Sequence, residues 1–228
     1  MMKTIGIMGG MGPMATVDLM KKIILATPAK TDQEHIPIVV DNAPQIPDRT
    51  KAILGQGESP VPAMVKSARR LETAGADFII IACNTAHYFL PEVAPQIKIP
   101  VLSIVETAAN EIRKRGYNKV GLLATSGTIR TGLYQKALNA KGIECLTPGA
   151  EKQHLIDDLI YDGVKASNMA YDTAPVRQLL DSMQQEGAEG FILGCTEVPV
   201  AVEMYNLKGA FIDSTEELAK ASVKMAKA

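Results

Sequence analysis

The sequence predicts an α/β protein built from two pseudo-symmetric parallel-sheet domains that face a shared cleft. Two observations lead to this prediction: short apolar runs alternate with helical patterns along the 228 residues, and segments of the first half recur in order in the second half. Alternating strands and helices are typical of βαβ units with parallel sheets. The 46% hydrophobic content is enough for a sizeable core, and the length alone fits one large domain or two of about 100 residues.

The expected strands are short apolar runs, and the expected helices lie between or after them. The strands are expected at residues 4–8, 37–41, 77–82, 101–104, 119–124, 190–194 and 210–212. The helices are expected at residues 15–25, 62–74, 105–115, 130–140, 174–186 and 215–227. No low-complexity segment or linker-like tract interrupts this alternation.

An internal repeat relates the two halves of the chain. Three pairs of segments match in the same order: I-G-I-M-G-G-M-G with V-G-L-L-A-T-S-G, G-A-D-F-I-I-I-A-C with G-A-E-G-F-I-L-G-C, and V-L-S-I-V-E-T with G-A-F-I-D-S-T. In the first pair Gly6 aligns with Gly121, and the second pair ends at Cys83 and Cys195. Three matches in register indicate two similar domains. The expected domains are residues 1–98 with 212–228, and residues 99–211.

The repeat places Cys83 and Cys195 at equivalent positions, each just after an expected strand. Open α/β sheets bind ligands at the carboxyl ends of their strands. If the two domains face each other, the two thiols approach one ligand from opposite sides. Asn84 follows the first cysteine and Thr196 the second, and such residues can begin a helix whose N-terminus favours a thiolate.

Three other interpretations of the cysteines remain open. A disulfide conflicts with the odd count of three cysteines and with an N-terminal segment typical of a strand instead of a signal peptide, since both indicate a reducing compartment. Free cysteines are also often small core residues, and we interpret the unrepeated Cys145 in this way. A zinc site is weakly supported, because C-x-x-C is absent. The remaining interpretation is chemistry with two acid/base groups on opposite faces of a substrate, as in amino-acid racemisation.

The charge pattern argues against nucleic acid and membrane partners. The net charge is −1, both signs are mixed along the chain, and no block of Lys and Arg stands out. No segment approaches the roughly 20 apolar residues of a membrane span. We expect a soluble, cytoplasmic protein.

Four motifs together resemble the signatures of the aspartate racemase family, within the cofactor-independent aspartate/glutamate racemase superfamily. They are G-G-M-G-P-M-A-T at residues 9–16, N-A-P-Q-I-P-D-R-T at 42–50, A-C-N-T-A-H at 82–87 and L-G-C-T-E at 193–197. The resemblance covers essentially the whole chain. It implies two-base proton transfer between Cys83 and Cys195 on L- and D-aspartate or glutamate, with no cofactor and no metal, in a protein that is usually a homodimer.

The resemblance also assigns further site residues. Arg49 and Lys165 match its basic substrate-binding positions, and two cations suit a dicarboxylate, although taken alone both residues are ordinary surface charges. The other substrate-binding candidates are Met11, Gly12, Asn84, Thr85, Thr128 and Thr196. Simple helix capping is the competing interpretation for the Asn and Thr residues. His87 and Glu197 are candidates for tuning thiol ionisation, or are solvated helix residues.

A Rossmann-type, nucleotide-binding oxidoreductase is the main alternative. Gly10, Gly12 and Ala15 form G-x-G-x-x-A after a strand, and Asp41 ends the next strand. Against it, Pro13 intrudes after the second glycine, the repeat partner loses the fingerprint, and the paired cysteines stay unexplained. A non-catalytic protein that binds small anions is a further alternative, since it would need the arginine but neither thiol.

Overall fold

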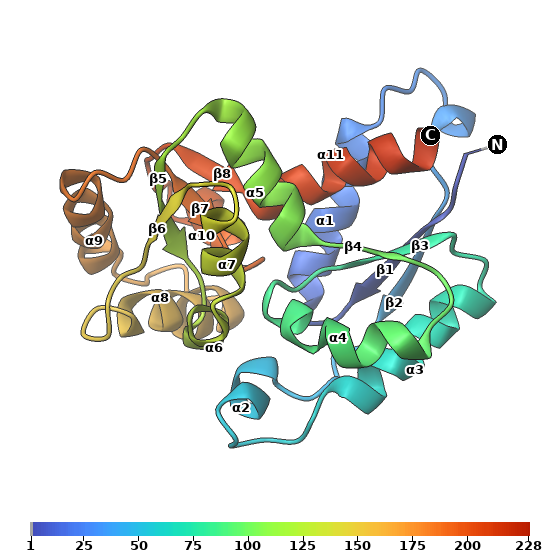
Figure 1. Ribbon diagram of the computed structural model, residues 1–228, viewed down its shortest axis with the longest axis horizontal. Helices are drawn as coiled ribbons and strands as arrows, with labels where there is room; N and C mark the ends of the chain where they lie inside the picture. Colours follow the sequence, from blue (N-terminus) through green and yellow to red (C-terminus); the bar gives the residue numbers. More distant parts are fainter. Residues whose placement is uncertain (1) are drawn as a thin grey trace. The chain divides into compact units, whose positions relative to one another are not determined.

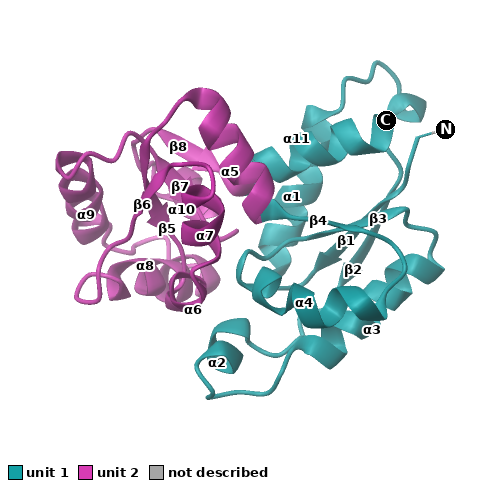
Figure 2. Cartoon of the chain, in the orientation of Figure 1, with its two compact units in different colours: residues 1–104, 215–228 teal, residues 105–214 magenta. Residues whose placement is uncertain are grey.

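A computed structural model describes residues 2–228 of the chain. The chain divides into two compact units, which Figure 2 shows in different colours. Unit 1 contains Met1–Ile104 and Thr215–Ala228, and unit 2 contains Val105–Ser214. The chain therefore crosses between the units twice, after Ile104 and after Ser214.

Unit 1 is built on a four-stranded parallel sheet in the order β2-β1-β3-β4 (Figure 1). Its strands are β1 (Ile5–Gly9), β2 (Ile38–Asn42), β3 (Phe78–Ile81) and β4 (Val101–Leu102). Its helices are α1 (Pro13–Ala26), α2 (Arg49–Ile53), α3 (Val61–Thr73), α4 (Leu90–Val93) and nearly all of α11 (Ser214–Lys227), with short 3-10 helices η1 (Asp32–Glu34), η2 (Thr85–Phe89) and η3 (Ala94–Gln96). Helix α3 packs on one face of the sheet, where Met64 and Leu71 join Met8 and Ile79 in a buried cluster.

Unit 2 repeats this plan with a parallel sheet in the order β6-β5-β7-β8. Its strands are β5 (Lys119–Leu123), β6 (Glu144–Leu146), β7 (Phe191–Leu193) and β8 (Phe211–Asp213). Its helices are nearly all of α5 (Ile104–Arg115), with α6 (Ser126–Thr131), α7 (Leu133–Asn139), α8 (His154–Asp158), the π-helix η4 (Leu159–Lys165), α9 (Ala174–Gln185) and α10 (Val198–Met204). In each unit the first strand lies between the second and the third, which confirms two similar parallel α/β halves.

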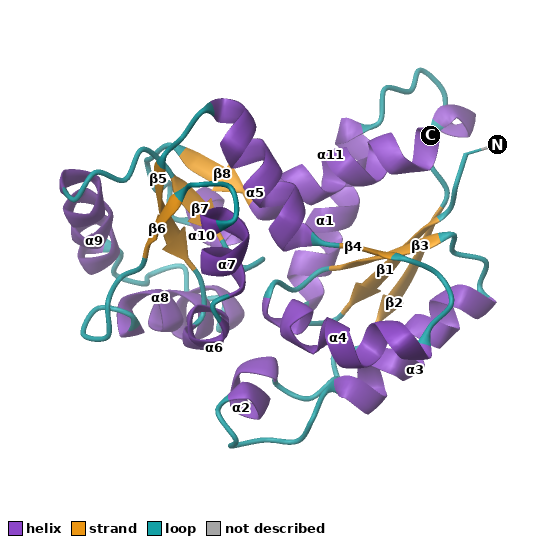
Figure 3. Ribbon diagram, in the orientation of Figure 1, coloured by secondary structure: helices purple, strands orange, loops and turns teal. Residues whose placement is uncertain are grey.

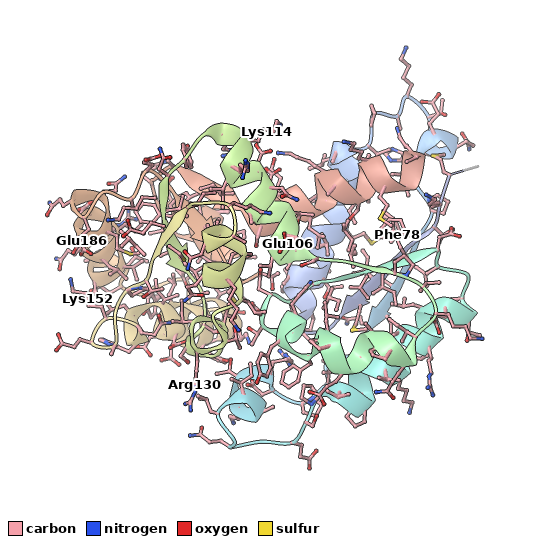
Figure 4. All side chains as sticks on the ribbon, in the orientation of Figure 1. Phe78, Glu106, Lys114, Arg130, Lys152 and Glu186 are labelled. Atoms are coloured by element: carbon pink, nitrogen blue, oxygen red, sulfur yellow. The ribbon has the colours of Figure 1, made fainter. Side chains whose placement is uncertain are left out.

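The apolar runs become strands because helices cover them. All four residues of β3, from Phe78 to Ile81, are buried, as are the three residues of β7. Strands that are apolar throughout are typical of parallel sheets with both faces covered. Figure 3 shows the helices around each sheet, and Figure 4 shows the side chains, with buried Phe78 in unit 1 and the exposed Lys114, Lys152 and Glu186 in unit 2.

The aligned glycines Gly6 and Gly121 have the same structural role. A Cβ atom at Gly6 would lie 2.8 Å from the Cβ atom of Ala76, and one at Gly121 would lie 2.6 Å from Cδ1 of Phe191. Both positions are in the first strand of their unit, where neighbouring groups approach too closely for any side chain. The repeated glycine therefore reflects close packing that both units need.

The unit boundaries differ from the expected domains, residues 1–98 with 212–228 and residues 99–211. Strand β4 pairs with β3 through Ile79 and Val101, so it belongs to unit 1. Strand β8 pairs with β7 through Phe191 and Phe211, so it belongs to unit 2. The chain leaves unit 1 only after β4 and leaves unit 2 only after β8, because pairing with the neighbouring strand holds β4 and β8 in their sheets.

Several short elements were not expected from the sequence. Strand β6 has three residues, E-C-L, which is too short for a periodic pattern. The helix expected at residues 130–140 is two helices, α6 and α7, because Gly132 between them has a left-handed φ of 67°. The π-helix η4 and the short helices α2, α8 and α10 also lacked a recognisable pattern. Across residues 2–228, no helix has the length and apolar character needed to cross a membrane.

Candidate functional site

Cys83 lies directly beyond the carboxyl end of β3, one residue after Ala82. Its side chain is buried, as are those of Asn84 and Thr85. The 3-10 helix η2 begins at Thr85, and Asn84 at its N-cap position makes no capping hydrogen bond through its side chain. Helix capping therefore does not explain the presence of Asn84 beside the cysteine.

His87 lies one turn after Cys83 and contacts its backbone instead of its thiol. The ring is buried, its Nδ1 lies 3.0 Å from the carbonyl oxygen of Cys83, and the N–H of Ile104 donates to its Nε2 at 3.2 Å. Burial lowers the pKa of His87 to about 4. His87 is therefore neutral at pH 7, and its two ring nitrogens contact backbone groups.

Cys195 lies in the corresponding place in unit 2, two residues beyond β7. Its thiol is buried and donates to Oε2 of Glu197 at 3.0 Å, and the hydroxyl of Thr196 donates to the same oxygen at 3.3 Å. Burial, followed by the negative charge of Glu197, raises the pKa of the Cys195 thiol well above its ordinary value. The resting side chain is therefore a thiol that faces a carboxylate.

This result corrects the expected effect of a helix N-terminus on Cys195. Helix α10 begins at Val198, with Glu197 at its N-cap position. Burial and the adjacent carboxylate raise the pKa of the thiol, and they outweigh the backbone N–H of Glu197 and the charge of Lys165, which both lower it. Glu197 is itself buried and is not a solvated helix residue.

Lys165 is the last residue of the π-helix η4. Its Nζ lies 3.8 Å from Oε1 of Glu197 and 4.6 Å from the centre of the Tyr161 ring, and about a third of its side chain is exposed. A π-helix is rare and is frequently found at functional sites. Lys165, Glu197 and Cys195 thus form a chain of contacts in which the cationic end reaches solvent.

Arg49 is buried, which contradicts its interpretation as an ordinary surface charge. It is the first residue of α2, after Asp48 at the N-cap position, whose carboxylate accepts from the N–H of Lys51. Its Nη1 donates to the carbonyl oxygens of Ile46 at 3.1 Å and Pro47 at 2.9 Å. The preceding loop therefore holds the guanidinium in a fixed orientation.

Met11 and Gly12 lie in the loop between β1 and α1, and Met11 is buried. The hydroxyl of Thr16 fastens this loop, because it accepts from the N–H of Gly10 at 2.9 Å and donates to the carbonyl of Gly12 at 2.9 Å. Gly10 has a φ of 89°, and a Cβ atom there would lie 2.4 Å from the backbone of Ala43. The glycine is thus required by packing within the protein.

The Rossmann alternative also fails at Asp41, which would bind the ribose of a nucleotide. The Nε of Arg70 donates to Oδ1 of Asp41 at 3.0 Å, and Nη2 of Arg70 makes a second contact with the other oxygen. The glycine fingerprint and the acidic residue therefore both have explanations within unit 1 that involve no nucleotide.

Thr128 is fully buried in unit 2, within α6. The residues that position Thr128 were not predicted from the sequence. The hydroxyl of Thr125 caps α6 by accepting from the N–H of Thr128 at 3.2 Å, and Asp157 accepts from the N–H of Ser126 at 2.9 Å. The Thr-x-x-Thr spacing in A-T-S-G-T could have predicted the cap from the sequence. Asp157 is distant in the sequence, and no sequence pattern indicated its contact with Ser126.

The candidates fall into two sets, one in each unit. In unit 1, Met11 and Gly12 follow β1 while Cys83, Asn84 and Thr85 follow β3, so neighbouring parallel strands bring them to the same edge of the sheet. In unit 2, Thr128 follows β5, and the residues Cys195, Thr196 and Glu197 follow β7, which pairs with β5.

All three cysteines are free, so the disulfide interpretation is wrong. A surface hollow of about 510 Å³ lies along α3 and is lined by none of these candidates.

Comparison with known proteins gives consistent matches over nearly the whole chain. The model of the family Asp/Glu/Hydantoin racemase matches residues 8–222. A broad specificity amino-acid racemase, RacX from Bacillus subtilis, is 30% identical over 225 residues that cover 96% of both proteins. Among solved structures, an aspartate racemase from Picrophilus torridus has a TM-score of 0.86 and 35% identity, over 99% of this chain and 94% of that one. An aspartate racemase homologue from Pyrococcus horikoshii has a TM-score of 0.79 and 30% identity over the whole of both chains.

Proposed function

Because this chain belongs to the Asp/Glu/hydantoin racemase family, we propose that it is an amino-acid racemase that interconverts L- and D-aspartate without a cofactor. The family matches confirm the resemblance found in the sequence motifs. The observation that carries the proposal is the Cys195 thiol, buried against Glu197 at the position that the repeat relates to Cys83. Glutamate is the second candidate substrate, since one methylene changes binding by only about 1–3 kcal/mol.

The proposal assigns the two carboxylates of the substrate to Arg49 and Lys165. An arginine held in a fixed orientation suits a two-point contact with a carboxylate, and a lysine acts as a point charge. The similarity to the Picrophilus torridus aspartate racemase supports a dicarboxylic substrate. Asn84, Thr85, Thr128 and Thr196, with the loop of Met11 and Gly12, would supply polar groups for the α-amino and α-carboxylate groups.

In the proposed reaction, one sulfur takes the Cα proton and the other delivers a proton to the opposite face of Cα. The C–H bond breaks, its electron pair stays on the substrate, and a new C–H bond forms with the proton from the second sulfur. Because resting Cys195 is a thiol, it is the proton donor for one direction and Cys83 is the acceptor. The reverse direction requires Cys195 to lose its proton first.

Glu197 is the group that can take this proton, since Cys195 already donates to it. Lys165 lies on the far side of Glu197 and stabilises the negative charge on that carboxylate. Lys165 also favours the Cys195 thiolate, because its positive charge lowers the pKa of that thiol. Glu197 as acceptor and Lys165 as nearby cation would together prepare Cys195 for proton abstraction.

The direct test is incubation of the purified protein with single enantiomers, followed by chiral chromatography. L-Aspartate and L-glutamate should be converted to mixtures of both enantiomers without added pyridoxal phosphate or metal. L-Asparagine, which lacks the second carboxylate, should react much more slowly if Arg49 and Lys165 act as proposed. Unchanged enantiomers of all three amino acids would contradict the proposed activity.

We also propose that the protein is a homodimer that forms through the outer face of α1. Five apolar side chains on this face are between 38% and 74% exposed, and they recur at helical spacing: Met14, Val17, Met20, Ile24 and Leu25. In unit 2, the helices that follow the first strand instead expose Arg130, Lys136 and Asn139. The fold therefore does not itself require an apolar surface at this position.

The size and composition of the α1 face fit a second copy of this chain. Its 14 residues make a helix about 21 Å long, enough for the centre of an interface that buries about 800 Å² on each partner. A two-fold interface uses the same patch on both partners, so a mainly apolar stripe, on which the exposed Lys21 also lies, is complementary to itself through its apolar side chains. Contiguous apolar patches of this kind are uncommon on monomers.

A further inference from the structure

His87 joins two parts of unit 1 that are far apart in the sequence. Its ring contacts the carbonyl of Cys83 at 3.0 Å and the N–H of Ile104 at 3.2 Å. Ile104 is the first residue of α5 and the last residue of unit 1 before the chain enters unit 2. One buried ring thus connects a candidate catalytic cysteine to the start of the helix that leaves the unit.

The protonation of the ring follows from its partners. The Ile104 N–H can only donate, so Nε2 must accept and carries no proton. The remaining ring proton is then on Nδ1, which donates to the carbonyl of Cys83. Both ring nitrogens are therefore used, and this neutral tautomer is the one that satisfies both backbone groups.

The contact with Ile104 acts as a helix cap from a distant part of the sequence. The first four N–H groups of an α-helix have no partner within the helix, and Ile104 provides the first of these in α5. Nε2 of His87 accepts this group, a role usually filled by a neighbouring Ser, Thr, Asp or Asn side chain. The side chain that caps α5 is thus also the side chain that holds the Cys83 carbonyl.

Unit 2 has a comparable connection at the second crossing. Ser214 begins α11 and is the last residue of unit 2. Its hydroxyl donates to the carbonyl of Leu193 at 2.6 Å, and Leu193 lies two residues before Cys195. In both units, therefore, the residue that begins the crossing helix is hydrogen-bonded to the chain segment that carries the cysteine.

We propose that His87 is a positioning residue that fixes the Cys83 thiol relative to the start of α5. The ring does this by holding the Cys83 carbonyl and the Ile104 amide at the same time. This inference rests on the proposed racemase function for its effect on turnover, but the two hydrogen bonds are features of the fold and are testable without any substrate. A histidine that only filled space in the core would need neither bond.

Two substitutions separate the two bonds. In His87→Asn, the amide nitrogen occupies the position of Nδ1 and keeps the bond to Cys83, but it does not reach Ile104. In His87→Gln, the amide oxygen occupies the position of Nε2 and keeps the bond to Ile104, but the donor to Cys83 is lost. Amide hydrogen exchange at Ile104 should therefore become faster in the Asn variant and stay close to wild type in the Gln variant.

The effect on turnover should be the same in kind for both variants. Each should lower kcat by about 10- to 100-fold with little change in KM, because small misplacements of a reacting group are costly. Exchange of the substrate Cα proton with solvent deuterium should weaken for the same enantiomer that Cys83→Ala affects. A loss restricted to the enantiomer that Cys195→Ala affects would overturn the proposal, as would wild-type kcat in a folded Asn variant with an unprotected Ile104 amide.

One measurement needs no variant at all. Nitrogen NMR shifts of His87 in the native protein should show a protonated Nδ1 and an unprotonated Nε2 near pH 7. The opposite tautomer would overturn the proposal even if both variants failed to fold. Absence of racemisation by the wild-type protein would instead contradict the proposed function, and the tautomer and the Ile104 exchange rates would still decide the role of His87.

Discussion

The Cys195 thiol donates a hydrogen bond to the Glu197 carboxylate across 3.0 Å, with both side chains buried. This arrangement has two opposing consequences. The negative charge of Glu197 raises the pKa of the thiol and so disfavours the thiolate. The same carboxylate is the base that can receive the thiol proton. The two effects therefore predict opposite changes in racemase activity when a substitution removes the negative charge of Glu197.

The first prediction is that Glu197→Gln lowers kcat by about 100-fold, which is the lower end of the usual contribution of a positioned proton acceptor. The pH profile of Cys195 alkylation should shift to lower pH in the same variant, because the repelling charge is gone. Glu203→Gln, an exposed position on the same helix, is the matched control and should match wild type. Higher activity in Glu197→Gln would show that the carboxylate only suppresses ionisation.

The second prediction concerns Arg49, which is buried and donates to two carbonyl oxygens. Arg49→Ala should lower the free energy of unfolding by about 1–3 kcal/mol, since hydrogen bonds to a charged group are lost. An exposed charge would contribute little to stability, so the size of this loss follows from the burial of Arg49. Arg49→Lys keeps the charge but loses the planar donor arrangement, so kcat/KM for aspartate should fall more than stability does.

Urea unfolding and steady-state kinetics on the same preparations measure both quantities. Arg130→Lys, an exposed position on α6, is the control and should change neither. Wild-type kcat/KM in Arg49→Lys would remove the guanidinium from the substrate site.

The sequence predicted the fold well where apolar runs are long enough to show a period. Strands β1, β3, β5 and β7 and the helices α1, α3 and α9 lie within a few residues of their expected positions, because burial on both faces leaves a continuous apolar signal. The unit boundaries were displaced because strand pairing, which holds β4 in unit 1 and β8 in unit 2, leaves no local mark in the sequence.

The candidate site was predictable only in part. The repeat identified Cys83 and Cys195 because both halves conserve the same strand-to-cysteine step within this one chain. The direction of each polar side chain was not predictable. His87 was expected either to tune a thiol or to be a solvated helix residue. It is buried, so the second expectation is wrong, and its ring binds the Cys83 carbonyl and the N–H of Ile104, which is 17 residues away and is brought close by folding.

The third prediction is a loss of stability on acidification that depends on His87. Its pKa is lowered to about 4 in the folded protein by burial, whereas an unfolded histidine titrates near 6.5. Between these values only the unfolded chain binds the proton. The stabilising effect of the neutral ring is therefore complete above about pH 6.5 and is lost as the pH falls towards 4, with a total of up to about 3 kcal/mol.

Urea unfolding at several pH values between 7 and 4 measures this loss. The carboxyl groups titrate in the lower part of the same range, so the comparison is with His87→Gln, which has no group of this pKa. The fall in unfolding free energy should be smaller in the variant. Equal slopes in both proteins would show that His87 protonates alike in the folded and unfolded states.

The fourth prediction tests the homodimer. Val17 is 60% exposed at the middle of the α1 stripe, and a glutamate there would place like charges opposite each other in a two-fold interface. Val17→Glu should therefore shift the mass from dimer to monomer in light scattering, without lowering the helix content. Lys136→Glu, on the corresponding helix of unit 2, is the control and should stay dimeric. A wild-type monomer at high concentration would contradict the proposed interface.

The last prediction is that both thiols are required for racemisation and that each serves one enantiomer. Cys83→Ala and Cys195→Ala should each abolish interconversion, because one face of Cα then lacks its proton donor and acceptor. Each variant should still exchange the Cα proton of a single enantiomer with solvent deuterium through the remaining sulfur.

The control for both variants is Cys145→Ala, which should turn over substrate normally. Cys145 is a partly buried cysteine on β6, and burial raises the pKa of its thiol to about 12. Since one sulfur must be ionised and the other protonated, kcat/KM should follow a bell-shaped pH profile, with the basic limb set by the Cys195 thiol whose pKa is raised. Full turnover in either single variant, or exchange of both enantiomers by one of them, would contradict the two-thiol mechanism.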